Sequence, residues 1–388
     1  MRKLNLTLNM RAHSNRSDPT LIQKHDAPSL KQVLGIVLVA YSVFFIVLRL
    51  AAGSLSLVGS TRFGDNPSYL EAAAAIRHWQ FAGVLVKQFW GLPYAVAGLC
   101  AVTGISERAG MVVVCILSSL VSVALCYRLW GGWVAVFFAL LSLDWFQRSL
   151  LGGAEPLFML MIFASFLALR QAKWAWSAVF GGLATVVRPF GIFALAGLGV
   201  QLLWQKKFRQ CAIAVAIALS IGCAYAWPLA HYLGGAFANV SMYQKSDWHG
   251  GLPFNWPFLA IIHDTIPINA PLTDLVLTLG WIAFVLLGLV VAVGTGDFIT
   301  YAKKYPAEIC FVSLYCLALY TYDAPGWSRS NFPRFALPML PWTLVFLRRF
   351  LPAHRWVVGA LAVISPALAA ASAIGIRNVW GLVHSHLR

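Results

Sequence analysis

The chain has 388 residues, of which 60% are hydrophobic and only 11% are charged, and its mean hydropathy is +0.74. Soluble domains carry about 25% charged residues, so this composition excludes a soluble globular protein. The net charge of +16 does not indicate a nucleic-acid partner, because its basic residues lie in a terminal tail and in short breaks between apolar runs. We therefore predict an all-α integral membrane protein that contacts membrane lipids and binds no nucleic acid.

Residues 1–32 are polar and basic, and we predict that they form a cytoplasmic tail. Six of the 29 basic residues lie there: Arg2, Lys3, Arg11, Arg16, Lys24 and Lys31. The apolar run that follows, 33–58, is longer than the hydrophobic region of a secretory signal, and no convincing cleavage site comes after it. This run is predicted to be an uncleaved membrane anchor.

Further apolar runs continue to residue 376. A spanning helix needs about 20 apolar residues, and the runs predict about eleven spans in one membrane domain over 33–376. The runs cover 33–58, 110–127, 132–147, 155–170, 174–188, 190–204, 210–230, 272–294, 306–322, 335–347 and 356–376. A short carboxyl-terminal tail, 377–388, is expected after the last run.

One apolar run, 90–104, is short and contains Gly91, Pro93 and Gly98. We predict that it forms a juxtamembrane helix on the outer face. Every second connection between the spans then lies in the cytoplasm, and these connections carry the basic clusters that are typical of cytoplasmic loops. These clusters are Arg128, Arg170 with Lys173, Lys206 with Lys207 and Arg209, Lys303 with Lys304, and Arg348 with Arg349 and Arg355. The amino terminus is then cytoplasmic and the carboxyl terminus outside, in a membrane predicted to be the bacterial inner membrane.

This orientation places most acidic residues at or near the outer face. Two long loops lie there, 59–109 and 231–271, whereas the inner loops are short. The acidic residues concerned are Asp65, Glu71, Glu107, Asp144, Glu155, Asp247, Asp264, Asp274 and Asp323. Functional residues concentrate on loops held by a rigid scaffold, so we expect the chemistry on the extracytoplasmic side.

The segment GDNPSYLEAAAAIRHW, residues 64–79, carries the strongest local pattern. Asn66 is predicted to cap a helix that has Pro67 in its first turn and Tyr69 on one face. Asp65 lies at the positive end of this helix. It either helps the helix to start or faces the membrane bundle as a functional group.

Several segments, taken in chain order, resemble motifs of the GT-C superfamily, which comprises polytopic transferases that take sugars from polyprenyl-phosphate or related lipid donors. They are Arg49 within the first span, Asp65 with Tyr69 before an alanine-rich helix, KQFWGLPY from Lys87, AEPLF from Ala154, GLATVVRP from Gly182 and RFALPMLP from Arg334. The chain departs from the family pattern in two places. Asn66 follows Asp65 where the family often has glutamate, and Phe335 stands where it often has tyrosine.

The resemblance implies a GT-C-like fold with juxtamembrane helices in the first outer loop, and it implies roles for single residues. Asp65 would be the catalytic base, and Glu155 would orient the acceptor or share a divalent ion, Mg or Mn, with Asp65. An aspartate has an unperturbed pKa of about 3.9, so burial or a neighbouring carboxylate would have to raise it. The lipid phosphate would be held by Lys87, Arg188 and Arg334. Asn66, Tyr69 and His249 are the other expected substrate-binding residues.

Each of these residues also has a purely structural explanation. Lys87 and Arg188 could extend to lipid headgroups, and Glu155 begins a helix, where an acid is favourable in any case. In the second outer loop, Asp247 and His249 have no third ligand nearby in sequence, so no metal site is predicted there. The aromatic residues of that loop either stack on sugars or belong to the interfacial belt: Tyr243, Trp248 and Trp256.

The predicted function is an inverting transfer of a sugar from a polyprenyl-phosphate donor to an extracytoplasmic lipid or glycan acceptor. Two other functions agree with the same pattern. A transporter or flippase of a lipid-linked sugar would predict paired broken helices and a charged site at mid-membrane. A non-catalytic scaffold subunit of an envelope-synthesis complex would keep the fold and the lipid site without turnover.

Overall fold

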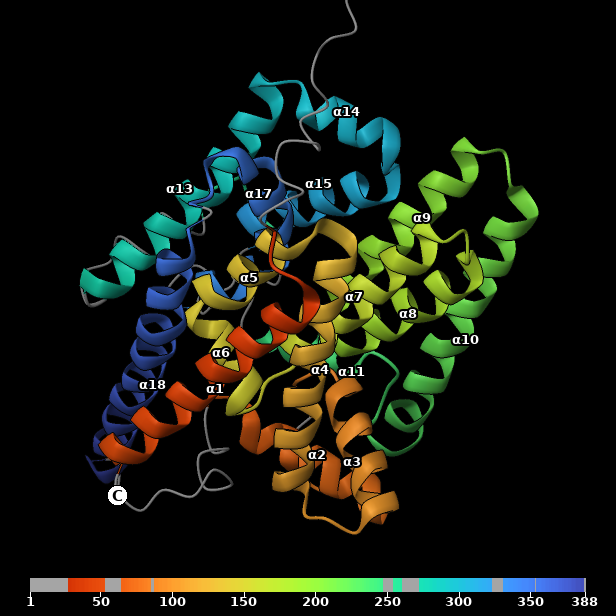
Figure 1. Ribbon diagram of the computed structural model, residues 1–388. Coiled ribbons are helices and arrows are strands. Elements are labelled where there is room, and N and C mark those ends of the chain that lie inside the picture. Colours follow the sequence, from red (N-terminus) through yellow and green to blue (C-terminus); the bar gives the residue numbers. More distant parts are fainter. Residues whose placement is uncertain are drawn as a thin grey trace, which may run out of the picture.

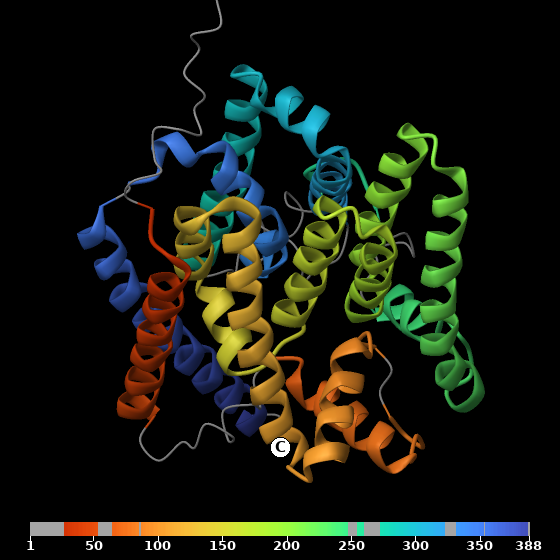
Figure 2. The same ribbon diagram turned by 45° about the vertical axis from the view of Figure 1, so that its right-hand side comes forward.

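The structure is a computed structural model that describes residues 27–52, 64–84, 87–246, 254–259, 272–322, 331–352 and 354–386. Over these ranges the chain is helical and forms no strand, only one β-bridge between Phe254 and Tyr322. The helices are α1 (Leu30–Ala52), α2 (Asn66–His78), α3 (Gly91–Thr103), α4 (Glu107–Trp130), α5 (Gly132–Leu141), α6 (Leu143–Leu150), α7 (Glu155–Arg170), α8 (Trp174–Val187), α9 (Ile192–Trp204), α10 (Phe208–Tyr232), α11 (Ala238–Ser246), α13 (Leu272–Gly294), α14 (Asp297–Lys304), α15 (Pro306–Thr321), α16 (Phe332–Ala336), α17 (Leu340–Phe346) and α18 (Arg355–His386). In Figures 1 and 2, α2 and α3 lie at one end of the bundle and α14 lies at the other.

Five of the described helices are long and apolar enough to cross a membrane: residues 30–50, 107–130, 208–232, 276–294 and 355–374. α6 and α7, bent by 102° at their junction, give a sixth if they form one broken span. The other apolar helices have 10–17 residues. The shortest of them, α5, is about 15 Å long, half the ~30 Å hydrocarbon core of a bilayer. The predicted all-α membrane class is thus confirmed as a bundle with five or six helices able to span.

Two predicted runs are wrong as single helices. The run 132–147 breaks at Ser142, whose hydroxyl accepts a hydrogen bond from the Trp145 amide at 3.3 Å and caps α6. The run 335–347 is divided by a 3-10 turn, Leu337–Met339, which separates α16 from α17. Both breaks follow from residues that stop helices, a serine able to cap in one case and closely spaced prolines in the other. The last helix, in contrast, continues to His386, so most of the predicted carboxyl-terminal tail is helical.

The start of α2 also differs from the prediction. Asp65, not Asn66, occupies the N-cap position, and its side chain makes no capping hydrogen bond. Asn66 is the first helical residue and is completely buried. Its side-chain amide donates to the Leu151 carbonyl oxygen at 2.8 Å, so it joins α2 to the α6–α7 junction. The carboxylate of Asp65 is therefore left for contacts outside its own helix.

The main hydrophobic core joins α1, α4 to α7, α15, α17 and α18. Trp145 and Trp342 are among its largest fully buried side chains. A second, smaller core holds α2 and α3 against α10 through Phe81, Trp90 and Leu229. The helices α2 and α3 are therefore fixed to the bundle, and Asp65, which precedes α2, has a defined position.

Close packing of α9 against α15 depends on one glycine. A Cβ atom at Gly197 would lie 2.3 Å from the carbonyl oxygen of Ala307, whereas a Cβ at Gly199 would meet nothing within 4 Å. Overpacking costs about 1–3 kcal/mol. We expect Gly197→Ala to lower the unfolding temperature measured in detergent, and the matched variant Gly199→Ala to leave it unchanged. Equal unfolding temperatures of the two variants would contradict this packing.

Candidate functional site

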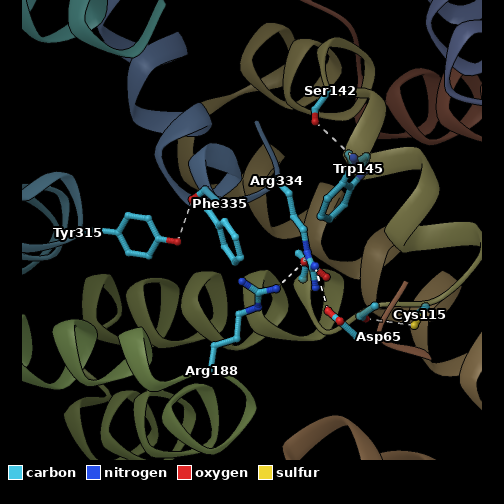
Figure 3. Close-up of polar contacts among 10 residues, drawn as sticks. Asp65, Cys115, Ser142, Trp145, Arg188, Tyr315, Arg334 and Phe335 are labelled. Atoms are coloured by element: carbon cyan, nitrogen blue, oxygen red, sulfur yellow. Dashed lines mark hydrogen bonds and ion pairs between the residues drawn. The ribbon is translucent and has the colours of Figure 1, made fainter. Parts of the chain in front are cut away.

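Charged side chains from five separate parts of the chain meet beside the start of α7. Glu155, the first residue of α7, accepts hydrogen bonds through Oε1 from Nη2 of Arg188 and from Nε of Arg334. Nη1 of Arg334 also donates to Oδ2 of Asp65 at 3.0 Å. Figure 3 shows Asp65, Arg188 and Arg334 converging on this point. We call Asp65, Arg148, Glu155, Arg188 and Arg334 the carboxylate–arginine cluster.

Local chain geometry brings these residues together. The backbone turns sharply at Gly152, whose φ of +114° favours glycine, and this turn delivers Glu155 at the start of α7. A Cβ on Gly153 would lie 2.6 Å from Oε2 of Glu155, so only glycine leaves room for that carboxylate. Arg188 ends α8 in an extended conformation immediately before Pro189, as expected for a residue that precedes proline.

Arg148 belongs to the cluster but is not among the site residues predicted from the sequence. It lies on α6 and is only 5% exposed. Its side chain packs against two glycines. A Cβ at Gly64 would lie 3.0 Å from Nη1 of the guanidinium, and a Cβ at Gly153 would lie 2.7 Å from Cδ of the aliphatic part. A single arginine between the apolar runs 132–147 and 155–170 is a signal that could have identified it.

The exposed fraction of the side chains decreases across the cluster from Asp65 to Glu155 and Arg334. The side chain of Asp65 is 41% exposed, whereas those of Glu155 and Arg334 are 3% and 7% exposed. Burial acts to raise the pKa of Asp65, but the charges of Arg334 and Arg148 outweigh it and the pKa is lowered. The raised pKa that a strong base requires is therefore not found, and Asp65 is ionised at neutral pH.

The lowered pKa of Asp65 links stability to pH. A carboxyl whose pKa is depressed by folding stabilises the protein above its unfolded value of about 3.9, and this contribution is lost as the pH falls through the folded value. We expect wild type to be more stable than Asp65→Asn at about pH 6, by less than ~1 kcal/mol because the pair is partly exposed. The difference should vanish near pH 3, as measured by thermal unfolding in detergent. A difference independent of pH would contradict the ion pair.

Phe335 supports both paired arginines. The centre of its ring lies 5.3 Å from Cζ of Arg188 and 5.5 Å from Cζ of Arg334. Its carbonyl oxygen accepts a hydrogen bond from the Tyr315 hydroxyl at 2.9 Å, which ties α16 to α15 (Figure 3). A phenyl ring between two guanidinium groups supplies cation–π contact and needs no hydroxyl.

The other expected binding residues lie around this cluster or outside the described ranges. Tyr69 is buried, and its pKa is raised by burial and by the charge of Asp65. Nζ of Lys87 lies 5.8 Å from the centre of the Tyr243 ring. Burial and the nearby Tyr69 and Asp65 also raise the pKa of Tyr243 on α11. His249 lies outside the described residues.

A divalent ion shared by Asp65 and Glu155, one of the two alternatives for Glu155, does not fit between these residues. The guanidinium of Arg334 already bridges these two carboxylates, and Arg188 binds the same oxygen of Glu155. A cation there would displace or face two arginines. Within the described part of the chain, no group of three or more histidine, cysteine, aspartate or glutamate side chains has the arrangement of a metal site.

A second buried ion pair lies at the opposite end of α7. Arg170 donates to both carboxylate oxygens of Glu308, at 2.6 and 2.9 Å, and to the Leu129 carbonyl oxygen at 2.6 Å. The hydroxyl of Tyr301 on α14 joins this network and accepts a hydrogen bond from the Trp130 indole at 2.8 Å. Each hydrogen-bonding group of this pair has a partner within the fold, which is the pattern of a structural joint. The carboxylate–arginine cluster differs, because Oε2 of Glu155 and Nε of Arg188 have no partner among the described residues.

These spare polar atoms, together with the exposed carboxylate of Asp65, give the cluster capacity to bind a polar ligand. A buried polar group without a partner costs about 1–3 kcal/mol, which a ligand that supplies the missing hydrogen bond would recover.

Searches with the chain found no matching protein-family model, curated protein or solved structure.

Proposed function

We propose that this protein is a membrane glycosyltransferase that moves a sugar from a polyprenyl-phosphate donor to an extracytoplasmic lipid or glycan acceptor. The observation that carries the proposal is the meeting of Asp65, Glu155, Arg188 and Arg334. Each was singled out from its own sequence motif, and the hydrogen-bonded pairs lie up to 269 positions apart in the chain. Independent motifs that converge on one point are expected of a working site.

We further propose a GT-C-like arrangement of about eleven spans, with the amino terminus in the cytoplasm of a bacterial inner membrane. The carboxylate–arginine cluster and the Arg170–Glu308 network lie at opposite ends of α7, which supports this topology. Glu155 and Arg170 are the first and last residues of α7, and 16 residues of helix correspond to about 24 Å. The shorter helices would then complete spans together with their flanking segments. The carboxylate–arginine cluster would face the extracytoplasmic side.

Arg188 is the residue best placed to hold the donor phosphate. One nitrogen of its guanidinium is bound to Glu155, while its Nε is buried without a partner among the described residues. The Arg188 side chain is 12% exposed, so part of it is accessible to a ligand. A phosphate oxygen would accept from Arg188 and gain a charge-assisted hydrogen bond. Glu155 then has the role of orienting both arginines.

In the proposed reaction the acceptor hydroxyl oxygen attacks the anomeric carbon of the donor sugar. A bond forms between that oxygen and the anomeric carbon while the bond from the carbon to the phosphate oxygen breaks. The electron pair leaves on the lipid phosphate, whose negative charge the arginines stabilise. The hydroxyl proton passes to the ionised carboxylate of Asp65 and then from Asp65 to solvent. Because Asp65 has a lowered pKa, it would accept the proton late, after the hydroxyl has become acidic.

The test is an assay of the purified, folded protein in proteoliposomes. Radiolabelled polyprenyl-phosphate sugars would be supplied one at a time with membrane extract as acceptor, and heat-treated protein would serve as the control. Label in a new product identifies the donor and supports the proposal. Movement of the intact donor between leaflets without product would favour a flippase. Donor binding with neither product nor movement would favour a scaffold subunit.

A further inference from the structure

An apolar cavity of about 670 Å³ lies between α1, α5 and α18. Figures 1 and 2 show α1 and α18 side by side along one flank of the bundle. The cavity is of the size that holds small molecules or lipid chains. It lies near the first turns of α1 and α18, where Gln32 and Arg355 are among its lining residues. No residue of the carboxylate–arginine cluster lines it.

Two glycines keep this cavity open. A Cβ atom at Gly35 of α1 or at Gly359 of α18 would meet nothing within 4 Å, so the space beside each backbone is empty of protein. The neighbouring valines of the lining, Val39 and Val363, are 56% and 52% exposed. An apolar cavity with exposed apolar residues on its rim suits a hydrocarbon chain, because such surface is stabilised by contact with lipid rather than water.

Polar groups mark one end of the cavity. Arg355, the first residue of α18, is exposed and lines the cavity. The indole nitrogen of Trp133, also on the lining, is buried and has no hydrogen-bond partner among the described residues. A tryptophan N–H in such a position needs an acceptor. A cation and an unsatisfied donor together therefore select a ligand whose polar end carries negative charge and accepting oxygens.

The position of this end along the bundle fits a lipid headgroup. Trp133 follows closely after Trp130, which belongs to the Arg170–Glu308 network at the far end of α7 from Glu155. Further basic residues, Arg348 and Arg349, lie between α17 and α18. Basic residues that flank spans attract anionic headgroups at about 1 kcal/mol each.

We propose that this cavity is a binding site for a membrane phospholipid with an anionic headgroup. One acyl chain lies along Gly35 and Gly359, and the phosphate accepts hydrogen bonds from Arg355 and Trp133. The site lies away from the carboxylate–arginine cluster, and the proposal does not rest on the transferase function.

The experiment reconstitutes the full chain in mixed vesicles of phosphatidylcholine and phosphatidylglycerol, extracts it gently and counts retained lipids by native mass spectrometry. Gly359→Phe fills the cavity and Arg355→Gln removes the charge. Gly222→Phe is the matched control, since a Cβ at Gly222 also meets nothing within 4 Å but the residue lies on α10. Each protein is checked for an unchanged elution volume and unfolding transition before lipids are counted.

Wild type and Gly222→Phe are expected to retain phosphatidylglycerol in preference to phosphatidylcholine. Arg355→Gln should weaken retention by about tenfold, the effect of losing one charge-assisted hydrogen bond. Gly359→Phe should abolish retention. Equal retention by all four proteins, or no preference for phosphatidylglycerol in wild type, would overturn the proposal. So would displacement of the phospholipid by a smaller amount of polyprenyl phosphate, which would make the donor lipid the occupant.

Discussion

Replacing Glu155 with glutamine is expected to destabilise the protein by about 3–5 kcal/mol, the cost of breaking a buried ion pair from one side. The Glu155 side chain is 3% exposed and pairs with both Arg188 and Arg334. Glutamine keeps the shape but removes the negative charge, so two largely buried guanidinium groups lose their shared counter-charge. The measurement is thermal and denaturant unfolding of the detergent-solubilised protein, followed by tryptophan fluorescence.

Glu71→Gln provides the matched control, because Glu71 lies exposed on α2. It should unfold like wild type, within the ±0.5 kcal/mol usual for surface changes. A double variant, Glu155→Gln with Arg188→Gln, should recover part of the loss, since one uncompensated cation is then absent. If Glu155→Gln unfolds like Glu71→Gln, the buried pair contributes nothing and the described geometry of the cluster is wrong.

Much of the helical arrangement follows from the sequence. Apolar runs bounded by basic or turn residues predict α7 and α13 with the bounds that the structure gives, 155–170 and 272–294. The breaks in the run 132–147 and in the run 335–347 were missed because hydropathy averages over a break of one to three residues. Ser142 within a strongly apolar run was the local signal for the first break, and Pro338 was the signal for the second.

The candidate site was predictable residue by residue but not as a set of contacts. A motif can indicate that Glu155, Arg188 and Arg334 are unusual, since charges at membrane depth are costly. It cannot indicate that one carboxylate oxygen serves both arginines, because the pairs are separated by 33 and 179 positions and depend on the tertiary packing. Arg148 was missed for a related reason. Its contacts with Gly64 and Gly153 become visible only when the α6–α7 turn is placed beside the start of α2.

Replacing Asp65 with asparagine is expected to reduce sugar transfer by about 10²-fold, the lower end of the usual contribution of a general base, because the pKa of Asp65 is lowered. The stability cost should stay small, because Asp65 is 41% exposed, unlike Glu155. Activity and folding are therefore separable at this position. The measurement is the steady-state rate of transfer in proteoliposomes with the donor identified by the panel, at about pH 7 and over a range of donor concentrations. Because its pKa is lowered, wild-type activity should show no acidic limb due to Asp65 between about pH 5 and pH 8.

The kinetic pattern distinguishes a base from a residue that only holds Arg334. If Asp65 accepts the proton, Asp65→Asn lowers kcat and leaves the KM for the donor nearly unchanged. If Asp65 merely orders the Arg334 guanidinium, with which it shares a 3.0 Å hydrogen bond, loss of the contact weakens phosphate binding and KM rises instead. Asp65→Glu should restore part of kcat in the first case, since it returns a carboxylate. Transfer by Asp65→Asn at the rate of Glu71→Gln would remove Asp65 from the reaction, leaving the arginines and Glu155 as a lipid-phosphate site without a base.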